Sequence, residues 1–427
     1  MPRRDGAPAQ SPWIVLAILW AVYVIHGIDR SVLLVLLEPI RKTFSLNDSQ
    51  IGLLTGLGYA APFALAGIPL GAISDRVRSR KAFLAMLIAL WSVLTAAGGL
   101  ATGFLMLLFT RACVGAAEAG APPTMLSLLG DTFDPRVRPA ALSVYFTAPF
   151  AGIMAGSIFA GDISGAHGWR VAVLAIGLPG LLAALLVVSL LREPKRGRFN
   201  APGGQSPVGQ PHAAAPVGTA LLYAVRNGNV LRLLLALILA AFVTLAILGW
   251  VPVLMERVFG LTQQRTGGLT ALVIGLPSII GSLAAGALAA RFGRGRASWL
   301  LLICGIAMLI AACLGTAALL TAAPRTALLL LATWSFAASI YTGSAWSVFT
   351  GAIPPAMRGT VTALGVVLVN LIGAGLGPQF VGLLSDALHR GHDQASLQHA
   401  MAAAALVNLV TGMLFLSSRK IGGSAPQ

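Results

Sequence analysis

The sequence predicts an all-α membrane protein with twelve transmembrane helices, arranged as two related bundles of six. Of its 427 residues, 57% are hydrophobic and only 10% are charged, and the mean hydropathy is +0.85. Soluble domains of this length carry far more charge. The apolar segments are continuous and approach the roughly 20 residues that a helix needs to cross a bilayer. Continuous runs favour helices over strands, whose side chains would alternate.

Six apolar segments come before a polar stretch and six come after it. The first six are approximately 12–37, 49–74, 81–102, 104–130, 139–163 and 169–191, and the second six are 228–255, 266–290, 297–321, 326–353, 359–387 and 396–416. The polar stretch is rich in Pro, Gly, Gln and Ala, so we expect a linker at 192–227. The bundles would then span 12–191 and 228–417, with tails at 1–11 and 418–427.

The net charge of +16 could suggest a nucleic-acid partner. However, Lys and Arg gather in alternate loops, and that pattern indicates membrane topology instead. By the positive-inside rule, we expect these loops and both termini to face the cytoplasm, in a bacterial inner membrane. Cys113, Cys304 and Cys313 all fall in apolar segments, where cysteine behaves as a small hydrophobic residue. We therefore expect no disulfide, metal site, cofactor or nucleic acid.

A loop motif is partly repeated half a chain apart. The end of the second segment is Gly71-Ala-Ile-Ser-Asp75-Arg76 and continues to Arg80, while the eighth segment has Ala290 where the first copy has Asp75. Asp75, at a helix end, can bind a neighbouring helix terminus and Arg76, which would form a gating latch broken in each transport cycle. The alternative is that these charges serve topology alone.

Glycines are spaced closely in both the fifth and the eleventh segments. They are Gly152, Gly156 and Gly161, and Gly373, Gly377 and Gly382. Small residues let helices approach closely, as a sliding interface requires. Two repeated bundles around a central cavity are the architecture of transporters that rock one half against the other.

Four ionisable side chains stand clearly inside spanning segments: Asp29, Arg30, Arg111 and Glu118. Such groups are costly in lipid and are functional hypotheses by default. Helical rise places Asp29 and Arg111 at one depth, with Glu118 two turns beyond Arg111 on the same face. Arg111 could exchange between the two acids, so we expect Asp29 and Glu118 to bind protons, with Arg111 and Arg30 as charge partners or as ligands of a substrate anion. The alternative is a static pair of Asp29 with Arg111.

Backbone breaks and polarity suggest a cavity with unequal walls. Pro122 and Pro123 should break or kink the fourth helix beside Glu118, although a simple packing kink would look the same. The second half offers mainly neutral polar and aromatic groups, including Asn370 and Tyr341. An amphipathic solute suits this asymmetry better than a sugar, whose hydroxyls need many polar partners.

Several strings resemble the Spinster family of the major facilitator superfamily. They are His-Gly-Ile-Asp29-Arg30, the Leu-Asn-Asp-Ser-Gln-Ile-Gly-Leu-Leu that opens the second segment, Arg111-x3-Gly-x2-Glu118-Ala-Gly, and Asn370-Leu-Ile-Gly-Ala-Gly-Leu-Gly-Pro with the later Leu-Ser-Asp386. Organic-anion transporters share the Asp-Arg pair, but the combined strings favour Spinster. The resemblance implies a major facilitator fold, Asp29 and Glu118 as protonation sites, and Arg111 as their partner. It also implies lysophospholipids or sphingoid phosphates as substrates of the animal members.

Two departures from the family pattern stand out. His26 occupies a position where Asn is common, and Arg78-Ser79 replaces a usual Gly-Arg. We expect His26 to be a packed polar residue, with a proton relay as the alternative. The leading function is a proton-coupled carrier of a lipid-like solute such as a lysophospholipid, and the alternative is a carrier of a small organic anion. No span contains a hydrolase or metalloprotease motif, so we expect a transporter and not an enzyme. We also expect the transporter to be monomeric.

Overall fold

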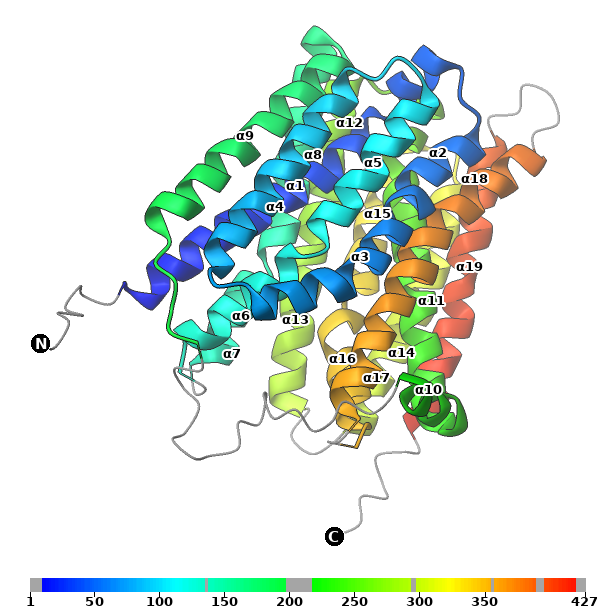
Figure 1. The fold of residues 1–427 in the computed structure, drawn as a ribbon. Coiled ribbons are helices and arrows are strands. Elements are labelled where there is room, and N and C mark those ends of the chain that lie inside the picture. The colour runs from blue at the N-terminus through cyan, green and yellow to red at the C-terminus, as the bar shows by residue number, and fades with distance from the viewer. Residues whose placement is uncertain are drawn as a thin grey trace, which may run out of the picture.

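The computed structural model describes residues 10–134, 137–196, 217–292, 297–354, 357–388 and 395–419, and all regular structure in these ranges is helical (Figure 1). Most of the predicted linker, including Arg198, lies outside the described residues, as do positions 293–296 of the second copy of the loop motif. The prediction of an all-α membrane fold is confirmed.

The first half contains the six predicted segments, three of them split into two helices. Its helices are α1 (Pro12–Phe44), α2 (Asp48–Thr55), α3 (Leu57–Arg76), α4 (Arg80–Gly99), α5 (Phe104–Glu118), α6 (Ala121–Thr132), α7 (Arg138–Tyr145), α8 (Ala148–His167) and α9 (Trp169–Leu190).

The second half is built in the same way, and two of its spans include π-helical turns. Its elements are α10 (Val217–Arg226), α11 (Gly228–Arg257), α12 (Gln263–Thr270), η1 (Ala271–Gly275), α13 (Leu276–Phe292), α14 (Ala297–Leu320), α15 (Pro324–Ser339), α16 (Tyr341–Gly351), α17 (Arg358–Leu368), η2 (Val369–Leu376), α18 (Gly377–Leu388) and α19 (Ala395–Ser417). Helix α10 occupies residues predicted to be linker.

Within the described ranges, 11 helical stretches are long and apolar enough to cross a membrane. The predicted segment 139–163 is not among them, because α7 and α8 are separate helices and the glycines, serines and Asp162 of α8 dilute its apolar character. Helix α8 still packs along α1 inside the bundle, as a sixth span of the first half would.

The predicted break beside Glu118 is present. Helix α5 ends at Glu118 and α6 begins at Ala121, with Pro122 and Pro123 in its first turn. These prolines have no backbone N–H to continue the α5 hydrogen-bond ladder. A Cβ at Gly120 would lie 2.7 Å from Leu87 Cδ1 and 3.1 Å from Leu70 Cβ, so the break is closely packed by both leucines.

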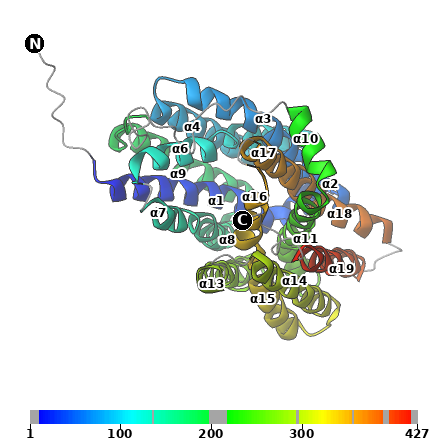
Figure 2. The same ribbon diagram turned by 90° about the horizontal axis from the view of Figure 1, so that it is seen from below.

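The two bundles lie side by side (Figure 2). We call the end where α2 begins and α18 ends the α2 end, and the opposite end, where α7 begins, the α7 end. The halves touch mainly through α2 with α18, α8 with α12, and α3 with η2. Toward the α7 end their ribbons diverge (Figure 1).

The apolar cores follow the same division. One buried cluster contains residues of both halves at the α2 end, including Leu36 and Ile40 of α1 with Trp250 and Leu254 of α11. The other two clusters each stay within one half. Among the described residues, the two halves share an apolar core at the α2 end alone. Because apolar burial favours contact, the halves are joined firmly at that end.

Candidate functional site

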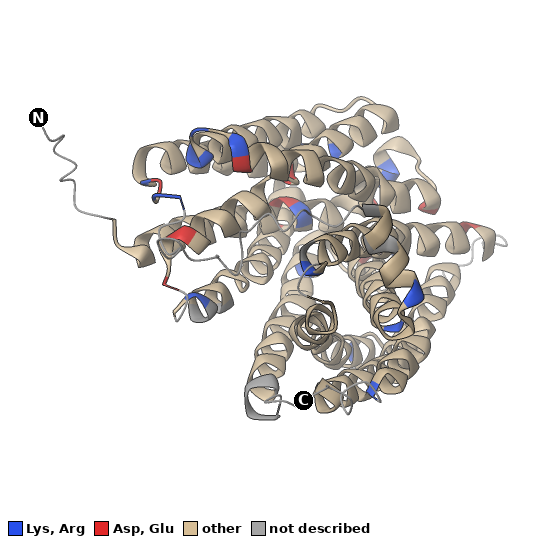
Figure 3. Cartoon of the chain, turned by 60° about the horizontal axis from the view of Figure 1, so that its bottom comes forward, with Lys and Arg blue, Asp and Glu red and all other residues tan. Residues whose placement is uncertain are grey.

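Charged residues are sparse along the helices (Figure 3), and a group of them lies inside the first half. Helix α1 contributes Asp29 and Arg30, and α5 contributes Arg111 and, as its last residue, Glu118. The predicted residues therefore gather in one region between α1, α3 and α5.

Glu118 is fully buried, at 0% exposure. Its Oε2 accepts a hydrogen bond from the Tyr59 hydroxyl and lies 3.2 Å from His26 Nε2. Its Oε1 has no hydrogen-bond partner among the described residues. A buried carboxylate left partly unsatisfied is costly, so this position is suited to a group that changes its proton content.

Asp29 is also buried, and its Oδ2 accepts a hydrogen bond of 2.9 Å from Thr95 Oγ1. Oδ1 has no partner in the described part of the chain. With Thr95 and Arg111, Asp29 lines a cavity of about 40 Å³, whose other walls are mainly apolar. That volume is enough to hold water, which would give the carboxylate a route for proton exchange.

Arg30 and Arg111 both contact the ring of Tyr59. Their guanidinium carbons lie 4.9 and 4.8 Å from its centroid. Within the described ranges, neither arginine forms an ion pair with a carboxylate at 4.0 Å or less, and Arg111 Nε is buried without a hydrogen-bond partner. The static Asp29–Arg111 pair is thus not formed in this conformation. Two arginines without an acid partner are available to an anion.

Tyr59 and Thr95 were not predicted as site residues, and His26 was expected to be a packed polar residue. Tyr59 lies on α3, just after the Gly56 break, and no spacing rule connects it with Glu118 on α5. Only the packing of α3 against α5 brings the two together. A tyrosine within an apolar span is the one signal that the sequence offered.

The residues of the predicted gating loop differ in exposure and in contacts. Gly71 lies in α3, and Asp75 and Arg76 at its end are exposed. Arg80, in contrast, is 2% exposed and donates to Asp131 Oδ2 at 2.6 Å and to Glu193 Oε1 at 3.3 Å. The buried charge of this loop is therefore Arg80.

The first residues after α9 are docked on this loop. Glu193 accepts hydrogen bonds of 2.8 Å from the Ser79 hydroxyl and from the Arg80 backbone amide. Burial tends to raise the pKa of Glu193, but these hydrogen bonds outweigh it and hold the pKa below its usual range. The Arg196 guanidinium donates to the carbonyls of Asp75 and Val77 at the end of α3, where a cation is favoured by the helix dipole.

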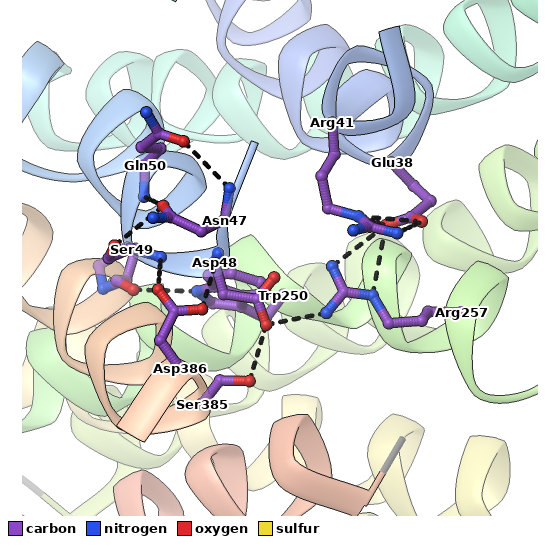
Figure 4. Close-up of polar contacts among 11 residues, drawn as sticks. Glu38, Arg41, Asn47, Asp48, Ser49, Gln50, Trp250, Arg257, Ser385 and Asp386 are labelled. Carbon is purple, nitrogen blue, oxygen red and sulfur yellow. Dashed lines mark hydrogen bonds and ion pairs between the residues drawn. The ribbon is translucent and has the colours of Figure 1, made fainter. Parts of the chain in front are cut away.

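A second polar network crosses between the halves at the α2 end (Figure 4). The Asp386 carboxylate of α18 accepts hydrogen bonds from the backbone amides of Asp48, at 3.0 Å, and Ser49, at 2.8 Å. Arg257 of α11 binds Asp48 at 2.8 Å and the buried Glu38 of α1 at 3.2 Å. We call this set, Glu38, Asp48, Arg257 and Asp386, the α2-end latch.

The α2-end latch was not predicted, although the sequence contains a signal for it. Helix α3 has Ile-Ser-Asp75 in its last turn, and α18 has Leu-Ser-Asp386 in its last turn. Each acid lies at the carboxyl end of a helix, and the spans of the two helices pack on each other, α2 with α18 and α3 with η2. Ser385 also donates to Asp48 at 2.7 Å.

Comparison with known proteins gives a family and several relatives. A model of the Major Facilitator Superfamily matches residues 19–378. Protein spinster homolog 1 of Homo sapiens is 27% identical over 98% of this chain and 82% of its own. An MFS-type efflux pump of Mycolicibacterium smegmatis is 27% identical over 90% of this chain and 87% of its own, and the sphingosine-1-phosphate transporter of Danio rerio is 25% identical over 96% of this chain and 84% of its own.

A solved structure has the same fold. The crystal structure of a bacterial homologue of the human lysosomal transporter Spinster, in an inward-facing and unoccupied conformation, has a TM-score of 0.83 and 26% identity, covering 99% of this chain and 100% of that one.

Proposed function

Because the chain belongs to the Major Facilitator Superfamily as a Spinster-like transporter, we propose that it couples proton movement to the transport of an amphipathic, lipid-like solute. The observation that carries this proposal is the pair of buried carboxylates, Asp29 and Glu118, beside two arginines that form no ion pair with a carboxylate of the described residues. The α7 end, with its excess of Lys and Arg, would face the cytoplasm.

The charges of the site support coupling between a proton and an anion. Asp29 and Glu118 balance Arg30 and Arg111 when all four are ionised. A proton on either acid leaves one positive charge in excess, which an anionic headgroup would neutralise. Proton and anion would then each strengthen the binding of the other, since such coupling is reciprocal.

The proposed substrate class is supported by the different polarity of the two halves and by the relatives. The arginines lie in the first half, whereas the interior of the second half is lined by apolar and neutral residues such as Trp334 and Tyr341. A lysophospholipid carries an anionic headgroup and one acyl chain, which match these two environments. One relative is named as a sphingosine-1-phosphate transporter, whose solute has the same general form.

Alternating access would use two latches, one at the α2 end and one at the α7 end. The α2-end latch is closed in this conformation, where Asp386 caps α2. Asp75, at the end of α3, is the counterpart of Asp386 and would cap the first turn of α17, near Arg358, when the α7 end closes. Gly71, Arg76 and Arg80 belong to the same loop, and Arg80 would hold it in position.

Uptake into proteoliposomes with an imposed pH gradient tests the proposal. We expect gradient-driven uptake of a fluorescent lysophosphatidylglycerol by the wild type and its loss in Asp29→Asn and Glu118→Gln, at unchanged expression. Asp162→Asn, an exposed acid of α8, is the matched control and should transport normally. Normal gradient-driven uptake by both site variants would contradict proton coupling.

A small organic anion is the second candidate, because Arg30 and Arg111 would bind a carboxylate as readily as a phosphate. The same vesicles distinguish the two. If a small carboxylate is taken up and the lysolipid neither enters nor raises the melting temperature of the purified protein, the second candidate is correct.

A further inference from the structure

We infer that His26 is a third proton-carrying residue of this transporter and that it takes its proton from Glu118. The inference deepens the proposed proton coupling and rests on it. His26 lies on α1, is 3% exposed, and places Nε2 3.2 Å from Glu118 Oε2. Histidine is the side chain that ordinarily changes charge near neutral pH.

A purely structural histidine would have its ring nitrogens satisfied. Here Nε2 has no hydrogen bond of normal geometry in the described part of the chain, and the Oε1 atom of Glu118 also lacks one. The ring is held by aromatic neighbours, Tyr23 at 5.5 Å and Trp91 at 6.0 Å between centroids. These contacts fix the imidazole in front of the carboxylate and leave its nitrogen free for a proton.

Every element around the ring contributes to its environment. The titratable or charged groups are Tyr23, Asp29 and Arg30 from α1, Tyr59 from α3, Arg111 and Glu118 from α5, and Tyr145, which stacks on Tyr23, from α7. Helix α4 adds only the neutral Trp91 and Thr95. Glu118 is thus the acid in direct contact with the imidazole.

The three proton acceptors are connected through Glu118. His26 is three residues before Asp29, about 4.5 Å away along the axis of α1. Glu118 interacts with both residues. A proton that enters at the Asp29 cavity can therefore pass to Glu118 and then to His26.

The last transfer balances without any other reactant. The O–H bond of protonated Glu118 breaks and an N–H bond forms at Nε2 of neutral His26. The products are a carboxylate and an imidazolium in contact. The site then carries one excess positive charge, as it does with a protonated acid, so an anion bound to Arg30 and Arg111 remains favoured during the transfer.

Nitrogen NMR of the ¹⁵N-histidine-labelled protein in detergent tests the inference without transport. His26 is assigned as the signal lost in His26→Asn. Spectra are recorded between about pH 9 and pH 5, and we expect an imidazolium signal in the wild type and less of it at the same pH in Glu118→Gln, where the carboxylate that contacts Nε2 is missing. A signal that stays neutral over this range, or that ignores Glu118→Gln, overturns the inference.

Transport measurements separate a proton role from a structural one. In His26→Asn we expect substrate binding to persist while the pH dependence of uptake shifts by about one unit or more. His167→Asn, an exposed histidine at the end of α8, should leave the profile unchanged. If His26→Asn does not fold, uptake by His26→Gln and the histidine spectrum of Glu118→Gln still test the proton role of His26. An unchanged profile in a folded variant contradicts the inference, whereas loss of proton coupling is judged separately from Asp29→Asn.

Discussion

Asp386, in the last turns of α18, accepts a hydrogen bond of 2.8 Å from the backbone amide of Ser49, in the first turn of α2. The acid of one half thus adds to the N-terminal capping of a helix in the other half, beside the N-cap residue Asn47. Its charge also opposes the positive end of the α2 dipole. The contact exists only while the α2 ends of the two halves are together, so its free energy favours this conformation.

Loss of the cap should shift the protein toward a state that is open at the α2 end. A cap contributes about 1 kcal/mol, so Asp386→Ala should raise the open population about fivefold. Spin labels at Thr102 and Ala322, in loops of the two halves at the α2 end, would report longer distances in a cysteine-free background. Asp162→Ala should leave the distances unchanged, and an unchanged distribution in Asp386→Ala would contradict a latch role.

The close approach of α8 and α12 offers a second way to open the α2 end. A Cβ at Gly267 would lie 3.0 Å from Gly161 Cα, whereas one at Gly268 would meet nothing within 4 Å. Gly267→Val should therefore separate the labelled loops and lower transport, and Gly268→Val should do neither. Equal behaviour of the two variants would show that glycine packing is not what holds the halves together.

The sequence predicted the helices better than their contacts. Apolar length was enough to place the spans, and the missing N–H groups of Pro122 and Pro123 were enough to place the break after Glu118. Contacts between side chains of different helices were harder to predict. Tyr59 and Glu118, for example, meet only through tertiary packing. Arg80 was predicted as part of the gating loop, but its buried ion pairs were not, since the carboxylates that surround it come from α6 and from the residues after α9.

Tyr59 combines two roles that substitutions can separate. Its ring contacts Arg30 and Arg111, and its hydroxyl donates to Glu118. Tyr59→Phe keeps the ring, so the affinity for lysophosphatidylglycerol, measured by tryptophan quenching, should change little while the pH dependence of uptake shifts. Tyr59→Leu also removes cation–π contacts of about 1 kcal/mol each, and its affinity should fall about fivefold or more. Equal affinities in both variants would exclude a role for the ring.

Glu193 should make the stability of the loop after α3 depend on pH. Its pKa is lowered in the folded protein, so the ionised carboxylate stabilises the fold above the ordinary value of 4.5. That contribution is lost as the pH falls through the lowered folded value. Glu193→Gln should lower the melting temperature at pH 7 by on the order of 2 °C, and the difference from wild type should vanish in strong acid. A difference that is constant with pH would rule out this carboxylate as the cause.

The cap that Asp386 places on α2 uses main-chain amides as its partners, and no side-chain substitution at Ser49 can remove them. Mutational tolerance at the two sides of this contact should therefore be unequal: position 49 can drift among many residues, proline apart, while position 386 requires a short acceptor. A library that randomises both positions and selects for transport would show this directly as a wide spectrum at one site and a narrow one at the other.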